Sequence, residues 1–208
     1  MKERLKIEGM ARILSFDESE HIYEVDGEVM PSVSEIIRFI AREVYGDVVQ
    51  SVLDNAADRG TRVHKATQML DVVGDVECDE DIVPYVTAYV QFVKEHKPKW
   101  DLIEKSMFNP AEKYAGTVDR IGMLDGKKTI VDIKTSSAIQ KVLYGAQLNL
   151  YHMMAHENGI EAERLVILHL TKDKGYKLIE IPIDDEVAKA CLTLHTALKK
   201  KARKKKNG

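Results

Sequence analysis

The sequence predicts an α/β protein in which helices flank a central mixed β-sheet. Apolar residues recur at helical spacing over residues 47–70, and the period changes to that of short strands from about residue 102. Beyond residue 135, helical and strand-like segments alternate towards the C-terminus. This order of elements predicts one sheet with helices packed against it.

The N-terminal part is predicted to be a β-hairpin followed by helices. Short strands joined by polar turns are expected over residues 12–30, where Asp26-Gly27 is typical of a tight hairpin turn. Either Ser32 or Ser34 would cap the next helix, and Glu35 would complete a capping box with Ser32. The longer helices that follow are expected at residues 47–70 and 82–95, the second ended by Pro98.

The central part is predicted to supply the sheet. Five strands are expected, at residues 102–108, 114–124, 129–135, 164–171 and 176–181. A helix at 141–157, ended by Asn158-Gly159, would separate the third and fourth strands. A final amphipathic helix is expected at 184–204, with Val187, Cys191, Leu194 and Leu198 facing inward.

Composition indicates one globular domain with a basic tail. The chain has 208 residues, of which 44% are hydrophobic, and no apolar run approaches a membrane span or a secretory signal. Its only cysteines are Cys78 and Cys191, as in a cytoplasmic protein with free thiols. Residues 199–206 hold seven of the 31 basic residues, and the remaining 24 face 34 acidic residues, a charge of −10. Such a tail is typical of a nucleic-acid partner or of a solvated helix end.

The stretch TVDRIGMLDGKKTIVDIKT, residues 117–135, carries a candidate site. If Asp125-Gly126 is a two-residue turn, counting along both strands places Asp119 opposite Asp132 on one face, with Lys134 on the same face. Facing carboxylates among apolar neighbours would share a proton, raise a pKa or bind a cation such as Mg²⁺. The alternative is a surface hairpin whose acids face water, and a one-residue slip would separate the two aspartates.

Five motifs in order resemble the PD-(D/E)XK nuclease superfamily, in its RecB-type and phage exonuclease branch. Residues 115–121, AGTVDRI, resemble the strand with the first carboxylate, and residues 131–135, VDIKT, resemble the D-x-K core. Residues 147–151, QLNLY, are similar to the Q-x-x-x-Y helix, and residues 59–64, RGTRVH, to the upstream helix ending in a histidine. Residues 21–37 resemble the opening of phage-associated members.

The resemblance implies a restriction-endonuclease-like core and a metal-dependent mechanism. Asp119, Asp132 and the main-chain carbonyl of Ile133 would bind Mg²⁺ or Mn²⁺, and His64 would supply a nitrogen ligand, which is more usual for Mn²⁺. Lys134 would position the attacking water. The resemblance covers about residues 21–171. We expect one nuclease domain at residues 1–198, with an N-terminal hairpin and helices at 1–98, a core sheet and helix at 99–182 and a helix at 183–198, followed by the basic tail at 199–208.

Three further residues are weaker candidates. Gln147 and Tyr151 lie one helical turn apart and would contact the metal-site lysine or the DNA backbone, or else they are core-facing helix residues. Glu104, in the strand before the hairpin, is a candidate metal ligand or an ordinary surface glutamate. Two cysteines cannot hold the four-cysteine iron–sulfur cluster of some relatives, so no cluster is expected.

The function that follows is a metal-dependent DNA exonuclease of the phage recombination or DNA-repair type. DNA with free ends is the expected substrate, a single-strand annealing or helicase protein is a candidate partner, and the cytoplasm of a bacterial or phage-infected cell is the expected location. A structure-specific endonuclease and a catalytically inactive DNA-binding module are the alternatives. Polarity, strand preference and oligomeric state are open from the sequence.

Overall fold

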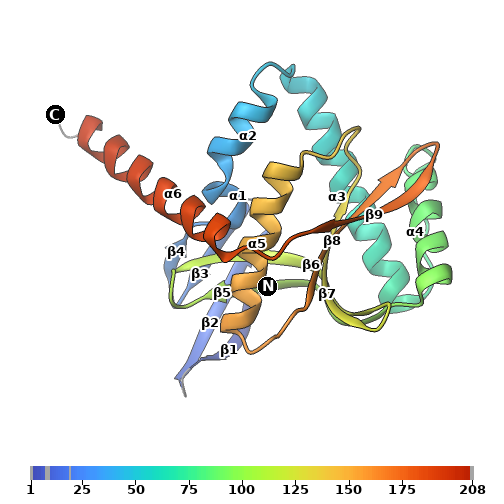
Figure 1. Cartoon of the computed structure of the whole chain (residues 1–208), viewed down its shortest axis with the longest axis horizontal. Coiled ribbons are helices and arrows are strands. Elements are labelled where there is room, and N and C mark those ends of the chain that lie inside the picture. The colour runs from blue at the N-terminus through green and yellow to red at the C-terminus, as the bar shows by residue number, and fades with distance from the viewer. Residues whose placement is uncertain (1, 8–9, 19, 207–208) are drawn as a thin grey trace.

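A five-stranded mixed sheet forms the centre of the molecule (Figure 1). The computed structural model describes residues 2–7, 10–18 and 20–206, with side chains for 12–18 and 20–202. The strands lie in the order β5-β6-β7-β8-β9, and only β7 and β8 are parallel to each other. Their bounds are β5 Lys99–Asn109, β6 Tyr114–Leu124, β7 Lys127–Lys134, β8 Arg164–Thr171 and β9 Gly175–Ile181. The predicted fold class is confirmed.

The turn between β6 and β7 has the predicted geometry. Asp125 and Gly126 both have positive φ, 51° and 79°, and Leu124 pairs with Lys127. Positive φ at both central residues is the hallmark of the type I′ hairpin turn, which glycine enters freely. The register on which the candidate site depends is therefore the one counted from the sequence.

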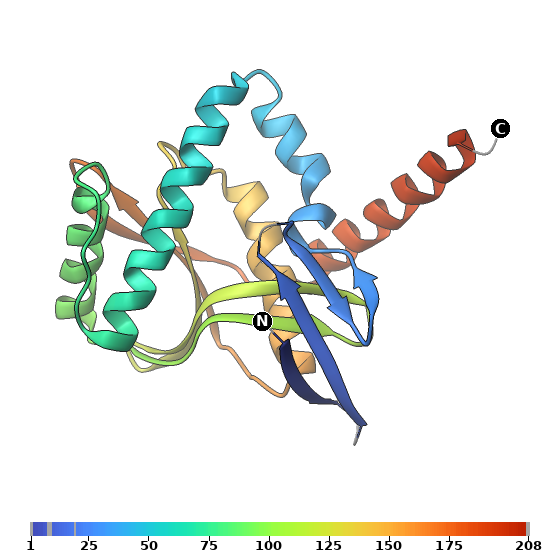
Figure 2. The same cartoon turned by 180° about the vertical axis from the view of Figure 1, so that it is seen from behind.

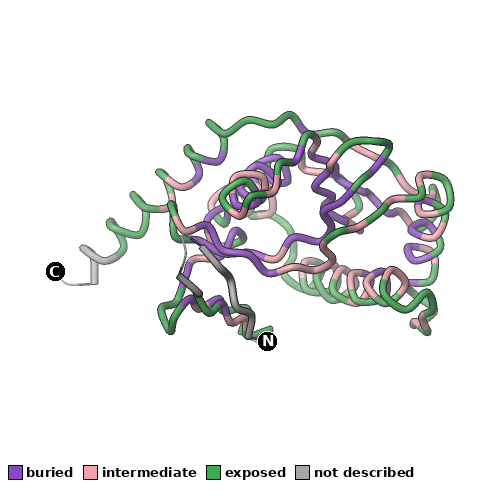
Figure 3. Tube along the Cα trace, turned by 90° about the horizontal axis from the view of Figure 1, so that it is seen from below, coloured by how far each residue is buried: buried purple, intermediate pink, exposed green. Residues whose placement is uncertain are grey.

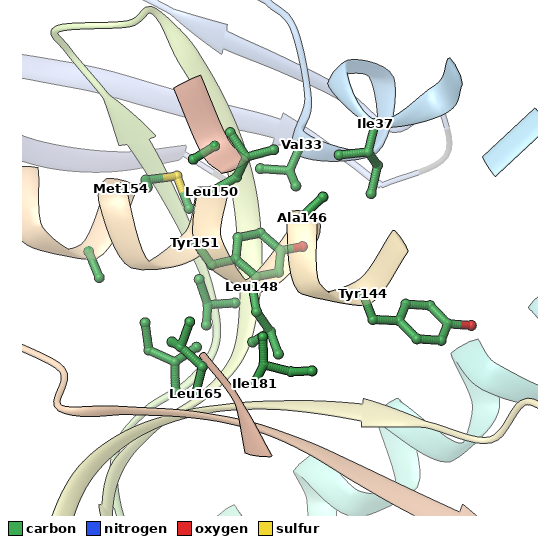
Figure 4. Packing of buried hydrophobic residues seen from close by; sticks show 14 of the residues in the cluster. Val33, Ile37, Tyr144, Ala146, Leu148, Leu150, Tyr151, Met154, Leu165 and Ile181 are labelled. Atoms are coloured by element: carbon green, nitrogen blue, oxygen red, sulfur yellow. The ribbon is translucent and has the colours of Figure 1, made fainter. Parts of the chain in front are cut away.

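Helices cover both faces of the central sheet. On one face, α5 (Lys141–Glu157) and α1 (Val33–Ile36) pack against Ile121, Ile130 and Leu165 (Figure 4). On the other face, α3 (Gln50–Val73) and α4 (Val83–His96) pack against Leu124, Val131 and Leu168. A parallel strand pair needs a long crossover connection, and α5 supplies it between β7 and β8.

A second, antiparallel sheet precedes this core. It comprises β1 (Lys2–Ile7), β2 (Met10–Asp17), β3 (Ile22–Val25) and β4 (Glu28–Met30), so the predicted hairpin is confirmed and β1 is an addition to it. Leu14, Tyr23 and Val25 pack against Phe108 and Ala115 of the central sheet. The Ser32 hydroxyl accepts a hydrogen bond from the Glu35 N–H, which confirms Ser32 as the cap of α1.

The predicted helix over residues 47–70 is shifted by about one turn. It begins at Gln50, and a separate helix precedes it, α2 (Arg38–Tyr45). The two helices meet at an angle and stand above the sheet like an inverted V (Figure 2). α3 ends at Gly74, whose φ of 85° is the left-handed conformation that glycine adopts at helix ends.

The last helix, α6 (Asp185–Lys206), leaves the body of the molecule (Figures 1 and 3). Its first turns pack on α5 and α1, and of the four residues expected to face inward only Cys191 is buried. Val187, Leu194 and Leu198 are 36%, 40% and 46% exposed, because the helix runs past the edge of the core. That expectation was wrong for these three residues. No described helix is long and apolar enough to cross a membrane.

Candidate active site

The candidate site lies where β6 and β7 separate. Their pairing ends at Arg120 and Val131, so Asp119 and Asp132 stand one step beyond the last pair. The Ile133 N–H donates to Asp119 Oδ2 at 2.6 Å, which uses the freed backbone of β7. On the other side of Asp119, Glu104 has a positive φ of 46°, an uncommon conformation for a strand residue. The ladder is thus distorted at the acids.

Three side chains from three elements converge at this point. His64 of α3 places Nδ1 3.2 Å from Glu104 Oε1 and 3.5 Å from Asp119 Oδ1. Its other nitrogen, Nε2, lies 3.0 Å from the carbonyl oxygen of Ile133. One ligand atom from each of His64, Glu104 and Asp119 lies within 4.8 Å of the others. The three residues therefore form a candidate divalent-metal site.

The charges in this group stabilise one another. Burial lowers the pKa of His64, but the charge of Asp119 and the hydrogen bond to Glu104 outweigh burial and raise it to about 9. Burial raises the pKa of Asp119 to about 7; the charge of His64 opposes this rise, and the charges of Asp132 and Glu104 add to it. Without a metal, the protonated His64 ring donates to the acceptors around it, so it supplies the positive charge that the carboxylates need.

Asp132 and Lys134 form the second half of the site. Lys134 Nζ lies 2.6 Å from Asp132 Oδ2, but neither carboxylate oxygen accepts an aligned hydrogen bond within the described part of the chain, although both are buried. Burial lowers the pKa of Lys134, while the charges of Asp132 and Asp119 outweigh burial and raise it. Lys134 is therefore a cation at neutral pH, suited to donating hydrogen bonds and stabilising negative charge rather than to accepting a proton.

The two residues expected from α5 lie beside this pair. Gln147 Nε2 donates to the Tyr151 hydroxyl at 3.2 Å, and the ring of Tyr151 packs in the core beside Val33 (Figure 4). Burial raises the pKa of Tyr151 well above its ordinary value, helped by the charges of Asp132 and Asp119. A Cβ on Gly116 would meet the Tyr151 ring at 2.9 Å. The glycine of the AGTVDRI stretch thus makes room for this tyrosine.

Sequence reasoning missed Arg120, a fully buried arginine next to Asp119. Its guanidinium donates to Asp71 Oδ2 at 2.7 Å, to Glu104 Oε1 at 2.8 Å and to Thr67 Oγ1 at 3.1 Å. Because Glu104 Oε1 also faces His64, Arg120 fixes one wall of the candidate metal site. A signal was present: Thr67 and Asp71 follow His64 at helical spacing, which places three polar residues on one inward face.

The oxygen and nitrogen atoms at this site suit the coordination of a divalent cation. Carboxylate and carbonyl oxygens suit Mg²⁺ and Mn²⁺, and an imidazole nitrogen favours Mn²⁺ of the two. The buried oxygens of Asp132 that accept no hydrogen bond mark the side of the site where a cation would satisfy an otherwise costly pair of acceptors. Asp119, Asp132, His64, Glu104 and the Ile133 carbonyl are the groups that would hold it.

Comparisons with known proteins give distant structural neighbours. No family model and no curated protein matches the sequence. Among solved structures, an alkaline exonuclease from Laribacter hongkongensis aligns with a TM-score of 0.40 and 13% identity over 83% of this chain and 91% of that one. The same exonuclease in complex with dAMP gives 0.41 and 13% over 84% and 94%. The protein SSO0001 gives 0.40 and 18% over 80% and 75%. Because these values are low, the function proposed below rests on the geometry of this chain.

Proposed function

We propose that the protein is a metal-dependent nuclease that hydrolyses phosphodiester bonds in DNA, with the site of the PD-(D/E)XK superfamily. The observation that carries this proposal is the convergence of Asp119, Asp132 and Lys134 with His64 and the Ile133 carbonyl where two strands separate. Residues 1–198 form one nuclease domain under this proposal. The Mg²⁺ or Mn²⁺ ion would supply Lewis-acid stabilisation of charge on the phosphate when bound.

The side chains of this chain have separable tasks in such a reaction. Lys134, held as a cation beside Asp132, orients the attacking water and stabilises negative charge that develops at phosphorus. Tyr151 stays protonated at neutral pH and donates a hydrogen bond towards the phosphate, and Gln147 orients its hydroxyl. Arg120 holds Glu104 against His64, so the buried side of the site is set before substrate binds.

An exonuclease of the phage recombination or DNA-repair type, in the cytoplasm of a bacterial or phage-infected cell, is the form that we favour. Support comes from His64 together with Gln147 and Tyr151, which the exonuclease branch combines with the D-x-K strand. A helicase or an annealing protein would be the matching partner, because either one generates or uses DNA ends.

The test compares end-labelled linear DNA with covalently closed circular DNA in Mg²⁺ and in Mn²⁺. Degradation of linear DNA alone is expected. Cutting of circles would indicate the endonuclease, and binding without cleavage in either metal would indicate an inactive DNA-binding module and overturn the proposal. Asp132→Asn should lose activity, whereas Asp101→Asn, which removes an acid paired with Lys128 on the surface, is the matched control.

A further inference from the structure

Two arginines on α2 differ from the other arginines of the body. The described side chains of Arg12, Arg59, Arg62, Arg120 and Arg164 each donate to a carboxylate or a carbonyl oxygen. Arg38 and Arg42 make no hydrogen bond or ion pair within the described residues, and both are exposed. A protein whose body is acidic thus keeps two cations unpaired on one short helix.

Arg38 and Arg42 share a helix face with Tyr45, which leads towards the active site. Arg38, Arg42 and Tyr45 stand at positions i, i+4 and i+7, so they share one face of α2. The Tyr45 hydroxyl lies 3.0 Å from the Tyr144 hydroxyl of α5. The ring of Tyr144 lies under Lys134, with Nζ 5.0 Å from its centroid. Two tyrosines therefore connect the arginine face to the lysine of the site.

The other end of this face meets the basic helix α6. His195 of α6 lies among Glu35, Arg38 and Lys199: Glu35 Oε1 is 3.9 Å from its Nε2. Lys199 stands one helical turn beyond His195, and Arg38 begins α2 three residues after Glu35. Burial lowers the pKa of His195, the charge of Glu35 raises it, and the charges of Lys199 and Arg38 lower it. Lys199, Lys200 and Lys201 are exposed on the part of α6 that extends from the body (Figures 2 and 3).

We propose that a DNA strand lies along this face, with its phosphates on Lys199, Arg38 and Arg42 and its path ending at Tyr45, Tyr144 and Lys134. We name Lys199, Arg38 and Arg42 the basic track. Unpaired cations in a row with aromatic side chains at one end are the elements of a single-strand binding groove. The inference rests on the proposed function for its catalytic end, but the binding that it predicts can be measured without catalysis.

The test is the salt dependence of DNA binding by the inactive Asp132→Asn protein without divalent metal. Anisotropy of a labelled single-stranded oligonucleotide gives the slope of log K against log salt. In that background, the double variant Arg38→Gln/Arg42→Gln should have a shallower slope. The magnitude of the negative slope should fall by about 1.4, because each phosphate contact on a single strand contributes about 0.7. Lys199→Gln alone should reduce this magnitude by about 0.7. Arg12→Gln with Arg62→Gln removes the same charge from arginines already paired with acids and should leave the slope unchanged.

Several outcomes would overturn the basic track. If the Arg38→Gln/Arg42→Gln variant has an unchanged salt slope, or if the control variant becomes shallower by the same amount, α2 does not bind the DNA. This holds even if Lys199 of α6 contributes. With Asp132 intact, the protein that carries Arg38→Gln and Arg42→Gln should hydrolyse the p-nitrophenyl ester of thymidine 5′-monophosphate as fast as the unchanged protein. This ester reaches only the site, so slower hydrolysis would indicate damage to the site instead of a lost binding face. Failure of the nuclease proposal is separate, because it appears as no hydrolysis by the unchanged protein.

Discussion

Two neighbouring clusters of buried charge differ in how many of their polar atoms have hydrogen-bond partners. Around Arg120, every partner is provided: Asp71, Glu104 and Thr67 accept from the guanidinium, and Tyr89 donates to Asp71 at 2.6 Å. Around Asp132, Lys134 is the close charged partner among the described residues, and both carboxylate oxygens lack an aligned donor there. Glu104 belongs to the Arg120 cluster and also faces His64 and Asp119, next to the point where β6 and β7 separate.

The difference distinguishes charge that serves the fold from charge kept for a ligand. A buried carboxylate without hydrogen bonds costs free energy that the rest of the fold has to offset. The Arg120 cluster avoids that cost, whereas Asp132 offsets it only through the ion pair with Lys134, at the place of the proposed metal site. Removing a charge should therefore cost much more stability in the Arg120 cluster than in the Asp132 cluster.

The largest effect is expected from Asp132→Asn. Nuclease activity should fall at least about 1,000-fold, which corresponds to about 4 kcal/mol of lost transition-state stabilisation. Stability of the metal-free protein should change little, because the neutral amide removes repulsion from Asp119 but also removes the ion pair with Lys134. Thermal melting in a chelator and turnover in Mn²⁺ measure both quantities. A strongly destabilised but active variant would reverse the assignment of this cluster.

Arg120→Met should have the opposite profile. Asp71 and Glu104 lose the cation that they share, although His64 still faces Glu104, and breaking a buried ion pair costs about 3–5 kcal/mol. Denaturant unfolding measures the loss. The double variant with Asp71→Asn should recover part of it, because one of the two stranded charges is then removed; no recovery would mean that packing of the arginine stem, not its charge, is what stabilises the cluster.

The same two clusters show which parts of the structure the sequence can predict. Its hairpin turn, the five strands and the helix at 141–157 follow from local signals, namely Asp-Gly, alternation and Asn-Gly. His64, Glu104 and Asp119 come from three separate elements, so only family motifs could group them before the fold was known. The pairing of Arg120 with Asp71 depends on how α3 lies across β6, which no local pattern specifies. The exposed stripe of α6 was misread for the same reason: amphipathic spacing predicts a face, not whether the core extends far enough to cover it.

The charge state of His64 should make the stability of the metal-free protein depend on pH. The pKa of His64 is about 9 in the folded protein and about 6.5 when unfolded, so its contribution is complete below pH 6.5 and is lost as pH rises through 9. Asp119, with a folded pKa of about 7 against 3.8, also binds its proton more tightly in the folded state and shifts stability in the same direction. The free energy of unfolding should fall by about 2–3 kcal/mol between pH 6.5 and 9.

Unfolding in a chelator across this range measures the slope, and His64→Gln should flatten it. Replacement of the exposed His156 by Gln is the control and should leave the slope as it is. Added Mn²⁺ should reverse the trend, because its ligands are deprotonated and binding to the folded protein adds stability. A slope that His64→Gln leaves intact would place the titrating group elsewhere.

The smallest effect is expected from Arg62→Gln, although its geometry resembles that of Arg120. Arg62 lies 2.9 Å from Asp58, 3.1 Å from Asp79 and 2.8 Å from Asp81, but those carboxylates are well exposed. Water replaces the lost contacts there, and surface ion pairs contribute little because solvent and salt screen them. The melting temperature should stay that of the unchanged protein at moderate salt, whereas Arg120→Met lowers it clearly. Equal losses for the two arginines would show that the number of carboxylate contacts, and not their burial, decides what an arginine contributes to this fold.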